Sequence, residues 1–138
     1  MKRHEIIIAY KPDILTLIDT QNVPMRDLAQ EFEDVEEFNY ENQGMLCLFN
    51  HRESKQNLIV GNCHLQWNPA KDYVKMGQAA YLMYKAARYV KDMSSNAQKS
   101  SSGPLPVILA GDLNSQPVSS ALSAIYGEDI IFGEPNEK

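Results

Sequence analysis

Two polar clusters, each at the end of an apolar run, carry residue types that suit chemistry on a phosphate ester. The run 107–111 leads into Asp112 and Asn114, so a carboxylate and an amide emerge together from an expected buried strand. An upstream strand-like run, 57–61, opens in the same way onto His64. Hydrolysis of a phosphodiester needs a base or positioner for water, and neutral donors for the phosphoryl oxygens as negative charge grows. The two strand ends therefore indicate a phosphate-ester site.

Each cluster also has a purely structural interpretation. A glycine, aspartate and asparagine can simply make an Asx-turn where a strand ends, and a lone strand histidine is more often a hydrogen-bonded core residue. Asp112 and Asn114, however, stand two positions apart and would share one face of a strand. His64 can donate to a phosphate oxygen near neutral pH. Because both clusters occur in one chain, we favour the phosphate contact.

The same segments resemble the endonuclease/exonuclease/phosphatase superfamily. Its members carry the sequences THL and GDFN at points that correspond here to residues 63–65 and 111–114. Residues 64–69, His-Leu-Gln-Trp-Asn-Pro, are similar to one branch, the carbon-catabolite-repressor type of poly(A) deadenylase, with its Angel relatives close behind and nocturnin further off. Residues 73–78 resemble the Asp-Val-Lys-Leu-x-Gln of that branch, although Tyr73 replaces the aspartate. This departure concerns the branch more than the superfamily.

The resemblance implies roles for three candidate catalytic residues. Asp112 matches the aspartate that orients or deprotonates water, and Asn114 matches the asparagine that binds the scissile phosphate. His64 matches a histidine that lies beside the same phosphate. Mg²⁺ or Mn²⁺ is the cofactor that the resemblance implies, and no residue of this chain is assigned to it as a ligand.

Three residues around His64 are candidate contacts to substrate. Asn62 stands two positions before His64 on the same expected strand. Pro69 matches the deadenylase proline that touches an adenine ring, so the resemblance implies a base-stacking role. Trp67 has two interpretations, a core anchor or a second contact to the base, and the core anchor is favoured.

Length and composition limit the class of protein. The chain has 138 residues and 43% hydrophobic content, enough for the core of one domain without disulfides. Cys47 and Cys63 lie in apolar runs without metal-ligand spacing, which favours small buried residues in a reducing compartment. The net charge of -5 argues against a protein that grips nucleic acid by bulk electrostatics. With no apparent signal peptide or membrane span, the cytoplasm is the expected location and the nucleus the alternative.

The first half of the chain is expected to form strands 5–10 and 14–19 joined by a turn at 11–13, a helical turn within 23–29 and an acidic loop at 31–41. Strands 44–49 and 58–60, joined by a long tip, are expected next. They are followed by a helix at 74–93, a serine-rich loop at 94–103, a strand from 107 and a helix at 118–126. The long helix is expected to bury one stripe, formed by Met76, Ala79/Ala80, Met83, Ala86/Ala87, Val90 and Met93. The order predicts an α/β fold, specifically part of a two-sheet αββα sandwich with mainly antiparallel or mixed strands flanked by helices.

The resemblance implies a metal-dependent phosphodiesterase, and its deadenylase branch implies a 3′ exoribonuclease that acts on the adenylate-rich 3′ end of RNA. The family's strand with the metal-binding glutamate, and its C-terminal strands with an aspartate and a histidine, have no counterpart in residues 1–138. We therefore expect a single, incomplete domain that is inactive by itself.

Two other functions stay open. A nuclease fold without catalysis could be an interaction module in a larger complex, where a protein partner covers exposed sheet edges. A hydrolase of nucleotides or other small phosphoesters would use the same residues on a smaller substrate. Products formed from an adenosine tract and from free dinucleotides distinguish the exoribonuclease from the small-molecule phosphatase.

Overall fold

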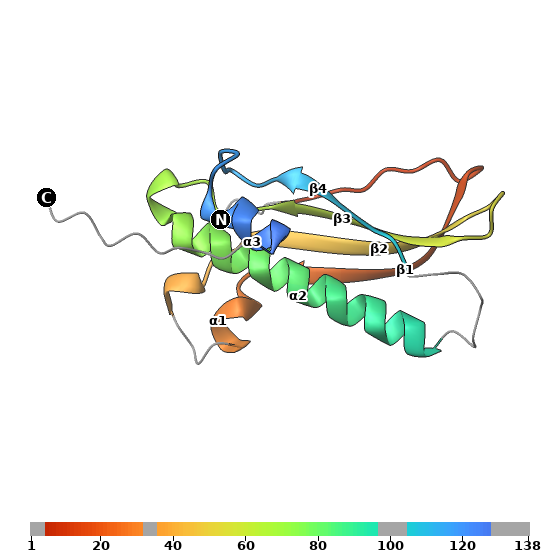
Figure 1. The fold of residues 1–138 in the computed structure, drawn as a ribbon, viewed down its shortest axis with the longest axis horizontal. Coiled ribbons are helices and arrows are strands. Elements are labelled where there is room, and N and C mark those ends of the chain that lie inside the picture. The colour runs from red at the N-terminus through yellow and green to blue at the C-terminus, as the bar shows by residue number, and fades with distance from the viewer. Residues whose placement is uncertain (1–4, 32–35, 97–104, 128–138) are drawn as a thin grey trace, which may run out of the picture.

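A four-stranded mixed sheet with helices packed against one face forms the body of the molecule (Figure 1). The structure is a computed structural model, and it describes residues 5–31, 36–96 and 105–127. In chain order its elements are β1 (Leu15–Pro24), α1 (Asp27–Glu31), the 3-10 helix η1 (Glu36–Phe38), β2 (Gln43–His51), β3 (Asn57–His64), the 3-10 helix η2 (Pro69–Lys71), α2 (Asp72–Asn96), β4 (Val107–Asp112) and α3 (Ser120–Tyr126).

The sheet has the order β1-β2-β3-β4, with antiparallel pairs at β1–β2 and β2–β3 and a parallel pair at β3–β4. The helix α2 lies in the crossover between the two parallel strands, because a parallel pair cannot be joined by a tight turn. Parallel strands end at the same edge of a sheet, so the residues that follow β3 and β4 emerge side by side. The predicted hairpin of the two middle strands and the predicted α/β class are confirmed.

The core lies between the sheet and α2. Leu46, Leu48 and Ile59 of the sheet belong to one buried cluster with Leu82 of α2. Phe49 follows Leu48 and is buried on the opposite face of the sheet, because successive strand residues alternate. β2 is therefore covered on both faces, as its unbroken apolar run predicts, whereas β3 alternates between buried and half-buried residues.

Residues 5–10 do not form a strand, so the predicted hairpin of 5–10 with 14–19 is wrong. The turn after them does form, because the carbonyl of Lys11 accepts two later backbone N–H groups at 3.0 and 2.9 Å. β1 begins there and pairs with β2 instead. The ring of Tyr10 packs against Phe49, with centroids 4.9 Å apart. Contact with the sheet face takes the place of strand pairing for this segment.

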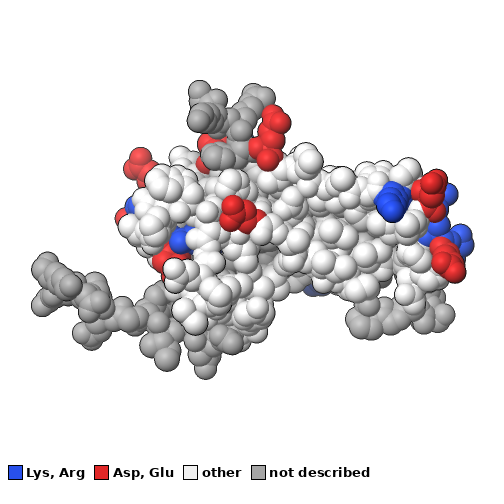
Figure 2. Space-filling model, turned by 90° about the horizontal axis from the view of Figure 1, so that it is seen from above, with Lys and Arg blue, Asp and Glu red and all other residues white. Residues whose placement is uncertain are grey.

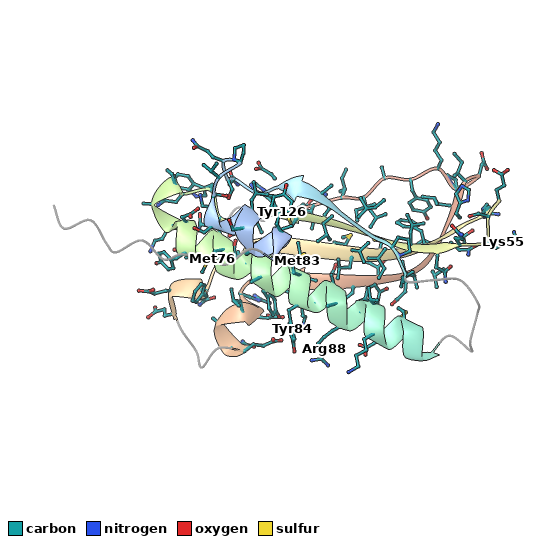
Figure 3. The ribbon with its side chains drawn as sticks, viewed as in Figure 1. Lys55, Met76, Met83, Tyr84, Arg88 and Tyr126 are labelled. Atoms are coloured by element: carbon teal, nitrogen blue, oxygen red, sulfur yellow. The ribbon has the colours of Figure 1, made fainter. Side chains whose placement is uncertain are left out.

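The helix α2 buries most of the predicted stripe together with further residues beside it. Of the predicted residues, Ala79 and Ala86 are buried, Met76 and Met83 are half-buried, and Ala80 and Ala87 are exposed. The buried side chains also include Val74, Lys75, Gln78, Tyr81, Leu82 and Tyr89. Figure 3 shows Met76 and Met83 on the part of α2 that runs beside α3, while Tyr84 and Arg88 project from the other side. Val90 and Met93 pack against the core as well, so the predicted stripe is confirmed in part, and the buried face is wider because α2 packs on both the sheet and α3.

The strand β4 lies at an edge of the sheet, and the expectation that it is buried is wrong. Every residue of β4 is exposed except half-buried Leu109, and Ile108 is 54% exposed. Figure 2 shows the molecule from above, with charged side chains gathered toward its two ends and few between them. The described residues thus form one sheet and one helical layer of the expected sandwich, without a second sheet over the outer face of β4.

The helix α3 begins and ends close to the predicted positions. Ser119 is its N-cap residue, and Gly127, with a φ of 70°, is its C-cap. Two predicted loops are wrong where the structure describes them, because residues 94–96 belong to α2 and Glu36–Phe38 form η1. The rest of the serine-rich loop predicted at 94–103 and residues 32–35 of the acidic loop predicted at 31–41 lie outside the described residues. Among the described helices, none is long and apolar enough to cross a membrane.

Candidate functional site

The parallel pairing of β3 and β4 places His64 opposite Asp112 at the ends of the two strands. Nε2 of the imidazole lies 3.9 Å from Oδ2 of the carboxylate. Both side chains are accessible, with exposed fractions of 34% for His64 and 65% for Asp112. The structure therefore brings together a histidine and an aspartate that the sequence singled out in separate segments.

A glycine and an Asx-turn direct the carboxylate of Asp112. Gly111 has a φ of 144°, and a Cβ at this position would collide with the backbone of Cys63, so a larger residue does not fit. The backbone N–H of Asn114 donates to Oδ1 of Asp112 at 2.9 Å. One carboxylate oxygen thus closes the turn and the other faces His64. The Asx-turn that a purely structural interpretation of this segment predicts is therefore present. It orients the carboxylate of Asp112, which stays exposed.

Asn114 links the two strand ends. Its φ of 48° lies in the left-handed region, which asparagine tolerates better than most residues. Nδ2 of its side chain donates to the carbonyl of Leu65 at 3.0 Å, and the N–H of Leu65 donates to the carbonyl of Asp112 at 2.9 Å. A side-chain amide has two donor hydrogens, and this bond uses one of them. The amide of Asn114 is therefore held at the residue that follows His64.

A buried amide network fixes the backbone around His64, and the sequence analysis missed it. Nδ2 of Asn42 donates to the carbonyl of His64 at 3.0 Å, and Oε1 of Gln78 accepts from the N–H of Gln66 at 2.8 Å. Nε2 of Gln78 donates to Oδ1 of Asn42 at 3.3 Å. The amide side chains of Asn42 and Gln78 are both buried. The sequence signal that could have revealed this network is Gln78, a polar residue on the inner side of the predicted helix. A buried polar side chain requires hydrogen-bond partners.

Cys63 lies beneath the site and does not supply a nucleophile. Its side chain is buried, and burial, followed by the negative charge of Asp112, raises the pKa of the thiol to about 11. The thiol is therefore protonated at neutral pH, whereas the thiolate is the reactive form. The prediction that Cys63 and Cys47 are small buried residues is confirmed.

The loop after His64 presents an exposed aromatic ring and an exposed proline. Trp67 is 68% exposed, so the interpretation of Trp67 as a core anchor is wrong. Asn68 caps the short helix η2 by accepting a backbone hydrogen bond of 2.9 Å, and Pro69 is the exposed first residue of that helix. An aromatic ring and a proline are thus accessible within five residues of the imidazole.

Asn62 lies on the same face of β3 as His64 because the two residues stand two positions apart. Its side chain is half-buried, and Nδ2 donates to the carbonyl of Ile7 at 2.8 Å. This bond ties residues 5–10 to the strand that carries the imidazole. The role of Asn62 in substrate binding stays a prediction.

Within the described ranges, no three histidine, cysteine, aspartate or glutamate side chains form a cluster that could hold a metal ion. Magnesium is usually held by one or two carboxylates together with water and substrate phosphates. Asp112 offers one such carboxylate, beside the imidazole of His64. The described residues therefore do not make a metal centre by themselves.

Comparisons with known proteins identify relatives of the chain. No family model matches the chain. The chain is 29% identical over 137 residues to the CCR4-Not complex 3′-5′-exoribonuclease subunit Ccr4 of Yarrowia lipolytica, with 84% of this chain and 19% of that protein covered. It is 29% identical over 128 residues to carbon catabolite repressor protein 4 homolog 5 of Arabidopsis thaliana, with 89% of this chain and 26% of that protein covered. The chain thus spans about a fifth to a quarter of the length of these curated relatives.

Solved structures share the fold. The crystal structure of ANGEL2, a 2′,3′-cyclic phosphatase, in complex with adenosine-2′,3′-vanadate matches with a TM-score of 0.61 and 26% identity, over 84% of this chain and 30% of that chain. An endonuclease/exonuclease/phosphatase family protein from Bacteroides thetaiotaomicron matches with a TM-score of 0.58 and 12% identity, over 86% of this chain and 38% of that chain. Because the relatives in sequence and the neighbours in fold agree, the resemblance to the endonuclease/exonuclease/phosphatase superfamily that the motifs predict is confirmed, and the chain is similar to CCR4-type proteins.

Proposed function

We propose that the chain is the central part of a divalent-metal-dependent phosphodiesterase that removes nucleotides from the adenylate-rich 3′ end of RNA. The observation that carries the proposal is the pairing of His64 with Asp112, whose Nε2 and Oδ2 atoms lie 3.9 Å apart at the accessible ends of parallel strands. Similarity to a protein named as a 3′-5′-exoribonuclease subunit supports the reaction class and its direction.

In the proposed reaction, water attacks the phosphorus of the last phosphodiester. Asp112 orients this water or takes its proton through Oδ2, since Oδ1 is engaged in the Asx-turn. His64 and the amide of Asn114 donate to the phosphoryl oxygens, on which negative charge grows. The bond from phosphorus to the upstream 3′ oxygen breaks, that oxygen takes up a proton, and a nucleoside 5′-monophosphate leaves.

Magnesium, with manganese as a substitute, is the cofactor proposed for the whole domain, and when bound it would neutralise charge on the phosphoryl group. The described residues hold no three-ligand cluster, so we place the main metal ligand outside them. Asp112 acts on the attacking water, and His64 and Asn114 act on the phosphoryl oxygens.

Trp67 and Pro69 are the proposed contacts to the terminal adenine. Both are exposed on the loop that follows His64. An aromatic ring and a proline can stack on a base while the attached phosphate lies at the imidazole, because stacking needs only a flat apolar surface. Asn62 is proposed to contact the same nucleotide from the face of β3 that carries His64.

Phosphatase activity on a small nucleotide is the second candidate function. It is favoured by the similarity to ANGEL2, which is described as a 2′,3′-cyclic phosphatase and was solved with an adenosine vanadate. The same residues would act, since a cyclic phosphodiester also needs an oriented water and donors for the phosphoryl oxygens. Hydrolysis of adenosine 2′,3′-cyclic phosphate, set beside shortening of oligo(A), separates the two functions.

An interaction module is the third candidate, and the exposed edge at β4 favours it. Val107 and Ile108 of this strand are 39% and 54% exposed. An unpaired apolar edge strand is a surface that another protein can cover. If the protein is catalytic, its proposed partner is RNA. If it is an interaction module, its proposed partner is a protein that covers β4.

The deciding experiment measures magnesium-dependent shortening of 5′-labelled oligo(A) RNA by the full-length gene product and by residues 1–138 alone. We expect the full-length product to shorten the RNA, Asp112→Asn to abolish shortening, and residues 1–138 alone to be inactive. Asp92→Asn, an exposed aspartate on α2, is the matched control and should cleave normally. Shortening that survives in Asp112→Asn would contradict the assigned role, and complete inactivity of the full-length product would favour the interaction module.

A further inference from the structure

A buried lysine lies in the first turns of α2, where a positive charge is unfavourable. Lys75 is 4% exposed and stands three residues after the first residue of the helix. The N-terminal end of a helix carries a partial positive charge, and a buried charge loses its hydration. A lysine at this place therefore requires strong compensating contacts, and the contacts that it makes lead to the candidate site.

The ammonium group of Lys75 binds the turn that follows β4. Nζ donates to the carbonyl of Asn114 at 3.0 Å, and it lies 3.7 Å from Oδ1 of Asp72. The other carboxylate oxygen of Asp72 accepts from Oγ of Ser120 at 2.7 Å, at the start of α3. The first turn of α2 thus holds the segment between β4 and α3 at both of its ends.

This contact acts on the residue whose backbone orients the catalytic carboxylate. Asn114 has a φ of 48°, its N–H donates to Oδ1 of Asp112, and its side chain donates to the carbonyl of Leu65. A left-handed conformation is unfavourable for a residue with a side chain unless its surroundings hold it. A charged donor on the carbonyl of Asn114 supplies that restraint, because hydrogen bonds from charged groups are the stronger ones.

We infer that Lys75 is a positioning residue of the phosphoester site, which holds the left-handed turn at Asn114 and so keeps Asp112 directed at His64. The inference that the site binds a phosphate rests on the proposed function, whereas the positional effect on the turn does not. Lys75 itself touches no substrate. Its effect passes through the Asn114 carbonyl, so loss of the ammonium should loosen the ends of β3 and β4 while the core stays intact.

Amide hydrogen exchange of the full chain tests the positional effect without any assay of function. In Lys75→Met, exchange of the Leu65 and Asn114 amides should rise about tenfold or more, while exchange at Phe49 and Leu82 stays near wild type. Lys75→Arg keeps the charge and a donor, and it should restore protection. Lys71→Met, at a half-buried lysine just before α2 that bonds Tyr73, is the control and should change none of these amides.

Exchange that rises equally throughout the protein in Lys75→Met would overturn the inference in favour of a general structural role, and unchanged exchange would overturn it as well. If Lys75→Met does not fold, Lys75→Gln, which keeps a neutral donor, is judged by the same four amides.

Affinity for adenosine 5′-monophosphate, followed by the fluorescence of Trp67, is the second readout. It should weaken about tenfold in Lys75→Met and recover in Lys75→Arg. A wild-type chain that does not bind this nucleotide would contradict the proposed function, and the exchange result would still decide the role of Lys75.

Discussion

His64 on β3 and Asp112 on β4 occupy partnered positions in a parallel register, and Nε2 of the imidazole lies 3.9 Å from Oδ2 of the carboxylate. Partnered residues of neighbouring strands face the same side of a sheet, so the two side chains share one face. The other carboxylate oxygen is engaged by the backbone of Asn114. A donor and an oriented acceptor therefore stand together at an accessible strand end.

Replacement of His64 by alanine should lower cleavage of oligo(A) by the full-length gene product about 100-fold or more, because a donor to the phosphoryl oxygens is lost. Melting temperature should change little, since the imidazole is partly exposed. His51→Ala is the matched control, because Nδ1 of His51 bonds Ser54 in the hairpin between β2 and β3. Equal loss of cleavage in the two variants would contradict the assignment.

Replacement of Gly111 by alanine should lower the free energy of unfolding by about 3 kcal/mol or more, because the φ of 144° and the backbone of Cys63 both oppose a Cβ. Gly127→Ala is the comparison: its φ is 70°, but the space beside it is open. We expect a cost of about 1 kcal/mol there. Urea unfolding measures both, and a Gly111→Ala cost no larger than that of Gly127→Ala would show that the close approach to Cys63 is absent.

The fluorescence of Trp67, the single tryptophan of the chain, should be quenched when oligo(A) binds, because the ring is 68% exposed on the loop after His64. Trp67→Ala should weaken binding by about 1–3 kcal/mol and change stability by less than about 0.5 kcal/mol. Binding of the variant is followed by filter retention of labelled RNA. Tyr126→Ala, at a ring 69% exposed on α3, is the control and should bind normally.

Stability should fall at alkaline pH because of Cys63. Burial and the charge of Asp112 raise the pKa of the folded thiol from 9.0 to about 11, so above pH 9 the unfolded chain binds fewer protons than the folded one. The contribution is complete below pH 9 and is lost as the pH rises to about 11, by at most about 3 kcal/mol. Burial and a hydrogen bond to Asp19 also raise the pKa of Tyr89, which acts in the same direction above pH 10.

Urea unfolding of the wild type and Cys63→Ala at pH 7, 9, 10 and 11 measures this difference. Cys63→Ala should lose less stability between pH 9 and 11 than the wild type, even where its stability at pH 7 is lower. Parallel curves for the two proteins would show that the thiol of Cys63 titrates at its ordinary pKa.

Local patterns predicted most of the elements because these depend on residues close together in the sequence. Apolar runs located β2, β3 and β4, and helical spacing of apolar residues located α2 and α3. The apolar residues 5–10 were assigned to a strand because the same residue types suit either strand pairing or contact with the face of a sheet. The interpretation of Trp67 as a core anchor was wrong because a hydrophobic ring can pack in a core or lie exposed, and its residue type does not distinguish the two.

By itself, the sequence identified the candidate site residues, because Asp112, Asn114 and His64 follow apolar runs that can be recognised from neighbouring residues alone. Only the tertiary structure decided which strands are neighbours. Side-chain alternation identifies a strand without naming its partner or its register. The parallel pairing of β3 with β4 across α2 therefore had to be seen before His64 and Asp112 could be placed together. The same holds for Lys75, because a buried polar side chain acquires its role from the group that packs against it, here the carbonyl of Asn114.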